Sequence, residues 1–239
     1  MRLDEAPALV RDDSPTAAVA DTFITDYYGF SWETTPSGPY TPLQAGNTYQ
    51  MTGTIDALLP PLTFNTSTNE YTFVITGGVQ VGPAVVAGSG SDFRGPYTTY
   101  QVTYADGAGF SIYEDPIAGG THYNWGTFPP NATSPATFTD GTPYLTATSR
   151  NWVAYINVYS SGSYAGQEIG SFDTDLTFTG GSHVGEVGGV GATGYNFAGL
   201  TKNPHASIPA GYKERIDGQQ FVTPVQPSTW GGIKQLFTN

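Results

Sequence analysis

Residues 48–56, Thr-Tyr-Gln-Met-Thr-Gly-Thr-Ile-Asp, alternate between apolar and polar side chains. In an extended chain Tyr49, Met51 and Ile55 fall on one side and the polar residues on the other. This period of two predicts a β-strand with one buried face. The same alternation recurs in three further stretches, 71–76, 100–104 and 172–179.

Two stretches give more specific expectations. Residues 100–112 alternate on either side of Asp106-Gly107, which is typical of a two-residue β-turn, so a hairpin is predicted there. Residues 152–159 are apolar on both faces, which predicts a central strand, or one whose tyrosine side meets a partner.

The organisation of the whole chain follows from these short strands. Helical periodicity is nearly absent, and Gly and Pro, 31 and 18 residues, punctuate the strands. The prediction is an all-β fold, an antiparallel β-sandwich or jelly roll with long Gly/Pro-rich loops. Residues 21–239 are expected to form a single domain, preceded by an extended N-terminal arm over residues 1–20.

Composition excludes several classes of function. The chain has 239 residues, with 8 Lys and Arg against 20 Asp and Glu, a net charge of −12 that disfavours nucleic-acid binding. It has no cysteine, so disulfides and thiolate metal sites are excluded, and no apolar run long enough to insert into a membrane. An acidic, lysine-poor, Thr- and Gly-rich chain is typical of bacterial secretion, so we expect an extracellular or cell-surface protein whose signal peptide has been removed.

No catalytic residue is assigned. Gly189-x-Gly191-x-x-Gly194 matches the dinucleotide fingerprint, but Asn203-Pro204 and the residues before it cannot make the helix that this motif needs. The enzyme class that stays open is a jelly-roll glycosidase, with Asp173 or Asp175 acting together with Glu168.

The same strand also carries the metal hypothesis. Asp173 and Asp175 lie two residues apart on one strand face, and carboxylates are hard oxygen ligands for calcium. The expectation is either no cofactor or a calcium ion at these aspartates.

An aromatic loop suggests a binding surface. His122, Tyr123, Asn124 and Trp125 combine flat rings with hydrogen-bonding side chains, a combination that binds sugars. A polysaccharide partner is therefore an alternative, with Trp125 as a plug of the core as the other interpretation.

The N-terminal region suggests self-assembly. A strong strand pattern over residues 22–32 follows the polar arm, and an arm of this kind can add a strand to the open sheet edge of a neighbour. The expected assembly residues of this strand are Phe23, Ile24, Tyr27, Tyr28, Phe30 and Trp32. The acidic first 33 residues and the three lysines of the last 40 also suit contact between copies.

Two segments carry a resemblance to a known group. Phe138-Thr-Asp-Gly-Thr-Pro-Tyr-Leu-Thr146, with Pro209-Ala-Gly-Tyr212 and Arg215-Ile-Asp-Gly218, resembles secreted, surface-sorted bacterial exoproteins. The resemblance implies an extracellular habitat and no known enzyme activity. The sorting tag of that group is missing before Asn239, which favours release or assembly over anchoring.

The leading hypothesis is thus a non-enzymatic extracellular structural protein, a self-assembling cell-surface or filament subunit joined by N-terminal strand addition. The alternative is a carbohydrate-binding module or adhesin that uses the aromatic loop. A jelly-roll glycosidase is the third hypothesis.

Overall fold

The structure is a computed structural model, and it describes residues 23–33, 45–117, 136–203, 208 and 211–222. These residues form ten strands and three short 3-10 helices, and no α-helix occurs among them. The strands are β1 (Phe23–Glu33), β2 (Thr48–Leu58), β3 (Asn69–Val79), β4 (Val85–Asp92), β5 (Gly95–Thr103), β6 (Gly109–Pro116), β7 (Thr142–Tyr159), β8 (Glu168–Gly180), β9 (Tyr195–Asn203) and β10 (Glu214–Val222). The 3-10 helices are η2 (Ala136–Phe138), η3 (Gly162–Tyr164) and η4 (Val184–Val187).

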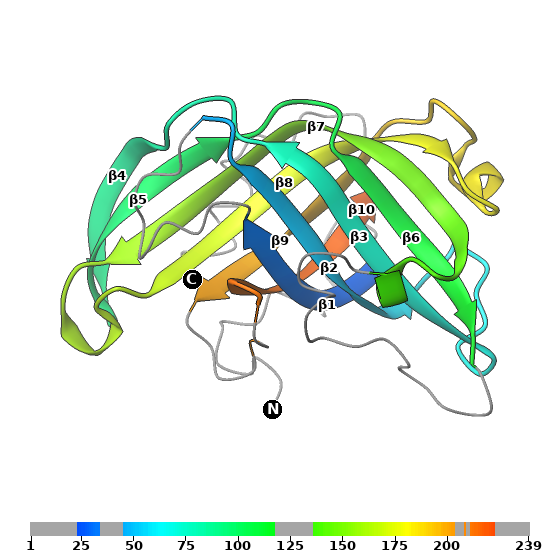
Figure 1. Cartoon of the computed structure of the whole chain (residues 1–239), viewed down its shortest axis with the longest axis horizontal. Helices are drawn as coiled ribbons and strands as arrows, with labels where there is room; N and C mark the ends of the chain where they lie inside the picture. Colours follow the sequence, from blue (N-terminus) through cyan, green and yellow to red (C-terminus); the bar gives the residue numbers. More distant parts are fainter. Residues whose placement is uncertain (1–22, 34–44, 118–135, 204–207, 209–210, 223–239) are drawn as a thin grey trace, which may run out of the picture.

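Eight of the strands close into an antiparallel β-barrel (Figure 1). Around the barrel the order is β1, β2, β3, β6, β7, β8, β9 and β10, and β10 returns to β1. Phe23 of β1 pairs with Phe221 of β10, and Ser31 pairs with Glu214. This pairing joins the two ends of the sheet, so the first and last strands have no open edge between them.

The closed barrel corrects the predicted sandwich or jelly roll. Alternation of apolar and polar residues reports that one face of a strand is buried, and the inside of a barrel meets that condition as well as the inside of a sandwich does. What separates the two architectures is which strands pair. That information lies in contacts between distant segments, such as β1 with β10.

The predicted hairpin over residues 100–112 is also wrong. The turn at Asp106-Gly107 is present, but β5 pairs with β4 and β7, and β6 pairs with β3 and β7. The two strands follow one another along the same side of β7: β6 pairs with residues 142–148 and β5 with residues 153–159. The 18-residue length of β7 gives room for both neighbours, since β5 and β6 have only nine and eight residues.

The prediction for residues 152–159 is confirmed. This stretch is the second half of β7, with β5 on one side and β8 on the other. Trp152, Ala154 and Ile156 are buried in the core.

Because β5 pairs with this half of β7, the β4–β5 hairpin extends the barrel wall at the end opposite the 181–194 loop (Figure 1).

Aromatic rings fill the inside of the barrel. Tyr27 stacks on Phe197 with ring centroids 4.2 Å apart, and Phe73 and Phe110 pack against Phe197 at 5.6 and 5.0 Å. Such interdigitated rings make the interior a packed core.

Candidate functional site: the open edge of the β4–β5 hairpin

The barrel interior leaves little room for a ligand. A cavity near the end where β10 begins is lined by Tyr49, Tyr104, Trp152, Thr201 and Glu214, with three core side chains. Its volume is about 10 Å³, roughly the space that one water molecule needs. A pocket for a small molecule is many times larger, so this cavity is a packing feature.

Glu214 beside this cavity is a buried carboxylate with partners. Its Oε2 accepts hydrogen bonds from Tyr49 Oη at 2.7 Å and from Ser31 Oγ at 2.9 Å. Burial and the nearby Glu214 carboxylate raise the pKa of Tyr49 well above its ordinary value, so the phenol stays protonated and donates. These fixed donors satisfy the buried Glu214 oxygen, which suits a structural role.

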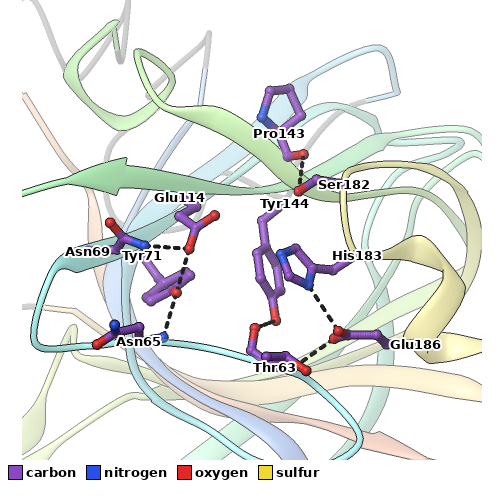
Figure 2. A network of polar contacts seen from close by, with 10 residues as sticks. All are labelled: Thr63, Asn65, Asn69, Tyr71, Glu114, Pro143, Tyr144, Ser182, His183 and Glu186. Carbon is purple, nitrogen blue, oxygen red and sulfur yellow. Dashed lines mark hydrogen bonds and ion pairs between the residues drawn. The ribbon is translucent and has the colours of Figure 1, made fainter.

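At the opposite end of the barrel, a polar network joins β3, β6 and the loop after β2 (Figure 2). Glu114 Oε1 accepts hydrogen bonds from Tyr71 Oη at 2.7 Å and from Asn69 Nδ2 at 2.6 Å. The backbone N–H of Asn65 donates to Tyr71 Oη at 3.0 Å. These bonds fix the 59–68 loop against the barrel rim.

The second half of this network holds the 59–68 loop to the 181–194 loop (Figure 2). Tyr144 Oη donates to the carbonyl of Thr63 at 2.9 Å, and the His183 ring stacks on Tyr144 at 4.2 Å. Glu186 accepts the Thr63 N–H at 2.7 Å, and its Oε1 lies 3.1 Å from His183 Nδ1. Desolvation works to raise the pKa of Glu186, but the bonds from Thr63 and His183 outweigh it and hold the pKa below its ordinary value. We call the contacts among Thr63, Tyr144, His183 and Glu186 the latch, and interpret them as the interaction that closes this end of the barrel.

β4 differs from every other strand that the structure describes, because it is paired on one side only. Its single neighbour is β5, whereas each of the other nine strands has neighbours on both sides. One row of backbone N–H and C=O groups along β4 therefore has no strand to pair with among the described residues. Such a row is a template for another strand.

The side chains of this edge are exposed and nearly uncharged. Val85 and Val86 are 54 % and 66 % exposed, and Phe93 in the following turn is 82 % exposed. Residues 85–91 include no charged residue, no lysine and no proline, the features that usually protect an edge. Asp92, the first charge, forms an ion pair with Arg94 at 3.0 Å.

The hairpin is held firmly on the barrel. Tyr159 Oη of β7 donates to Asp92 Oδ2 at 2.9 Å, and Thr99 Oγ1 of β5 donates to Asn157 Oδ1 at 2.7 Å. The rings of Tyr97 and Tyr159 contact each other at 5.5 Å. A partner strand would therefore meet a preorganised edge, which lowers the entropic cost of pairing.

The structure places the expected assembly strand inside the barrel wall. β1 pairs with β2 and β10 along both edges, so neither edge is open to a neighbour. Tyr27 lies in the core, and its hydroxyl donates to the carbonyl of Ala198 at 2.8 Å. Tyr28 contacts the Arg215 guanidinium at 4.4 Å, and Phe30 packs against Tyr212. Phe23, Ile24 and Trp32 belong to β1 by their backbone.

His122, Tyr123, Asn124 and Trp125, like the arm over residues 1–20, lie outside the described residues. The chain leaves β6 at Pro116 and enters η2 at Ala136, on either side of that aromatic loop.

The carboxylates of the glycosidase hypothesis do not converge. Glu168 lies on the same, inner face of β8 as Phe172, whereas Asp173 and Asp175 lie on the outer face. Asp175 accepts a hydrogen bond from Asn151 Nδ2 at 2.9 Å. Burial and the neighbouring Asp175 raise the pKa of Asp173 to about 6, although a hydrogen bond from Asn196 opposes the shift. Among the described residues no three His, Cys, Asp or Glu side chains gather as a metal site would require.

A groove on the outer face of β3 and β6 is larger than the cavity inside the barrel. Its volume is about 360 Å³, and it is bordered by η2. Hydroxyl side chains dominate its lining, which consists of Val74, Thr76, Gly109, Ser111, Tyr113, Ala136 and Thr139. A groove with hydroxyls and no charge suits a neutral, hydroxylated ligand.

Fold and edge together define a closed, eight-stranded antiparallel β-barrel that carries a two-stranded extension with one open edge. Comparison of the chain with protein-family models, curated proteins and solved structures found no match. In the part of the chain that the structure describes, no helix has the length and apolar character of a membrane span.

Sequence reasoning overlooked the β4 edge. The stretch over residues 85–92, Val-Val-Ala-Gly-Ser-Gly-Ser-Asp, has weak alternation and many small residues. Its sequence therefore gives little indication of a β-strand. The available signal was the stretch of 81–91 without any charge in an acidic chain.

Proposed function

We propose that this protein is a non-enzymatic extracellular structural subunit that self-assembles at the bacterial cell surface. The observation that carries the proposal is the edge of β4 that pairs with no other described strand. Its residues 85–91 are uncharged and mostly exposed, and β5 and β7 hold it in place. The described residues leave a cavity of only about 10 Å³ inside the barrel, far smaller than a substrate pocket, and this packing supports a structural role.

The position of β1 changes how assembly would occur. Because both edges of β1 are hydrogen-bonded within the barrel, adding it to a neighbour would require the barrel to open. β4 needs no such opening. Strand addition at β4 is therefore the less costly route.

Sedimentation velocity on the full chain, with negative-stain electron microscopy, tests the proposal. We expect particles heavier than 25.3 kDa, whose fraction rises with protein concentration. A monodisperse species of 25.3 kDa at all concentrations would overturn the proposal.

The hydroxyl-lined groove favours carbohydrate binding as a second candidate function. Tyr113 can stack on a sugar ring while Thr76, Ser111 and Thr139 bond its hydroxyls. A soluble glycan array tests this candidate. Binding that is lost in Tyr113→Ala supports it, and an array on which the wild-type protein gives no signal removes it.

A further inference from the structure

We infer that the partner of the β4 edge is the β4 edge of a second copy, paired antiparallel about a two-fold axis at Ser89. This inference rests on the proposed function of self-assembly and names the partner surface. It would join two barrels through one continuous sheet, since each β4 already continues into β5 and β7.

Charge makes this edge the favoured place for two copies to meet. Each copy carries a net charge of −12, so most pairs of surfaces repel one another. Residues 85–91 carry no charge, and Asp92 beyond them is paired with Arg94. Two acidic molecules can therefore approach along β4 without bringing carboxylates face to face.

The edge is also self-complementary. In a symmetric antiparallel pair, a central residue faces its own counterpart, and its flanking residues face each other. With Ser89 at the centre, two hydroxyl side chains meet, and Gly88 faces Gly90 of the second copy. Small residues at the centre let the two backbones approach without side-chain clashes.

The register of β4 with β5 extends this pairing outward. Gly88 pairs with Thr99 and Val86 with Tyr100, so Ala87 is an extra residue on the edge that faces β5. On the other edge, the axis at Ser89 places Ala87 opposite Ser91 and Val86 opposite Asp92 of the second copy. The exposed Val86 side chain then lies against the second strand, which removes apolar surface from water.

Tyr97 adds a contact near the axis. Its ring lies over Gly90, where an added Cβ would approach the hydroxyl to 2.6 Å. Because Gly88 of the second copy would lie opposite Gly90, it also leaves room for that ring. The glycines of β4 thus serve the pairing of the two copies as well as the hairpin itself.

Disulfide trapping tests the register directly, because the chain contains no cysteine. In Ser89→Cys the two thiols would face each other across the axis, within the distance that a disulfide between antiparallel strands requires. We expect mild oxidation to convert this variant to a covalent dimer. Two matched controls should stay monomeric on a denaturing gel. They are Ser91→Cys, two residues from the axis, and Ser67→Cys, in the 59–68 loop at the opposite end of the barrel.

A charge variant gives an independent readout. In Ser89→Lys two ammonium groups would oppose each other at the axis, and we expect the dimer dissociation constant to rise about tenfold or more. Circular dichroism of the variant should match the wild-type protein, because Ser89 is exposed and its replacement leaves the barrel intact.

The outcomes separate the inference from the proposed function. If the wild-type protein self-associates but Ser89→Cys forms no more dimer than the controls, the β4 pairing is overturned and self-assembly stands. If deletion of residues 1–20 abolishes association and leaves Ser89→Cys uncrosslinked, the arm is the partner and the pairing is likewise overturned. If the wild-type protein is monomeric throughout, the proposed function fails.

Discussion

At the scale of single residues, large aromatic side chains pack directly against glycines of the barrel wall. The Tyr27 hydroxyl lies where side chains on Gly199 and Gly218 would otherwise project, and the Phe73 ring occupies the corresponding space at Gly53. Such close approach leaves no room for a Cβ. Several glycines that look like strand breakers in the sequence are therefore packing positions.

Replacing Gly199 with alanine tests this packing. The added Cβ would lie 2.6 Å from Tyr27 Oη and 2.7 Å from the carbonyl oxygen of Asp217. We expect Gly199→Ala to lower the free energy of unfolding by about 1–3 kcal/mol, measured by urea denaturation. Gly82→Ala, where an added Cβ meets nothing within 4 Å, should change it little. Equal effects in the two variants would contradict the packing argument.

Asp173 gives a prediction for pH dependence. Burial and Asp175 raise its pKa to about 6, above the value near 4 of an unfolded chain. Folding therefore favours the protonated form, so the stabilising effect is complete below pH 4 and is lost as the pH rises through 6. We expect Asp173→Asn, which stays neutral, to match the wild-type protein near pH 4 and to exceed it by about 1–2 kcal/mol above pH 7. Denaturant titrations across this range measure the difference, and a constant difference at all pH values would refute the assignment.

At the scale of elements, two loops and a long strand define the ends of the barrel. The 59–68 and 181–194 loops are latched through Thr63, Glu186 and His183. At the other end, the second half of β7 reaches beyond β6 and supports the β4–β5 hairpin. One end is therefore closed by side chains, and the other is extended by a sheet with a free edge.

The latch predicts a local effect of Glu186→Ala. Loss of the carboxylate removes the acceptor of the Thr63 N–H, so hydrogen exchange of that amide should accelerate about tenfold. The effect should disappear on acidification, because the lowered pKa of Glu186 makes its contribution present at neutral pH and lost as the carboxylate protonates. Asp140→Ala, which removes a carboxylate from an exposed turn, serves as the control. Unchanged exchange at Thr63 would mean that other contacts hold the loops.

At the scale of the whole molecule, barrel closure and net charge both restrict assembly. The barrel removes every strand edge among the described residues except that of β4. The net charge of −12 keeps copies apart wherever the surface is acidic. The association that we propose would therefore use the β4 edge and would be opposed by long-range repulsion.

The repulsion between acidic copies predicts that added salt favours the dimer. Adding sodium chloride from low ionic strength to about 0.15 M shortens the screening length to about 8 Å, which weakens the repulsion between copies. Because the β4 edge contributes no ion pair to the contact, we expect the dimer fraction to increase with salt. Sedimentation equilibrium at several salt concentrations measures it, and dissociation by salt would indicate an interface held by ion pairs.

The alternation over 48–56, 71–76 and 172–179 was enough to identify strands, because the environment of a strand face repeats every two residues along the chain itself. The central position of residues 152–159 followed in the same way from two apolar faces. Composition excluded disulfides for the simple reason that the chain has no cysteine. The tertiary structure alone decided that β1 meets β10, that β5 and β6 share one side of β7, and that β4 has a neighbour on one side only among the described residues. Strand pairing depends on backbone contacts between residues far apart in the chain, and periodicity contains no information about which distant strand lies alongside.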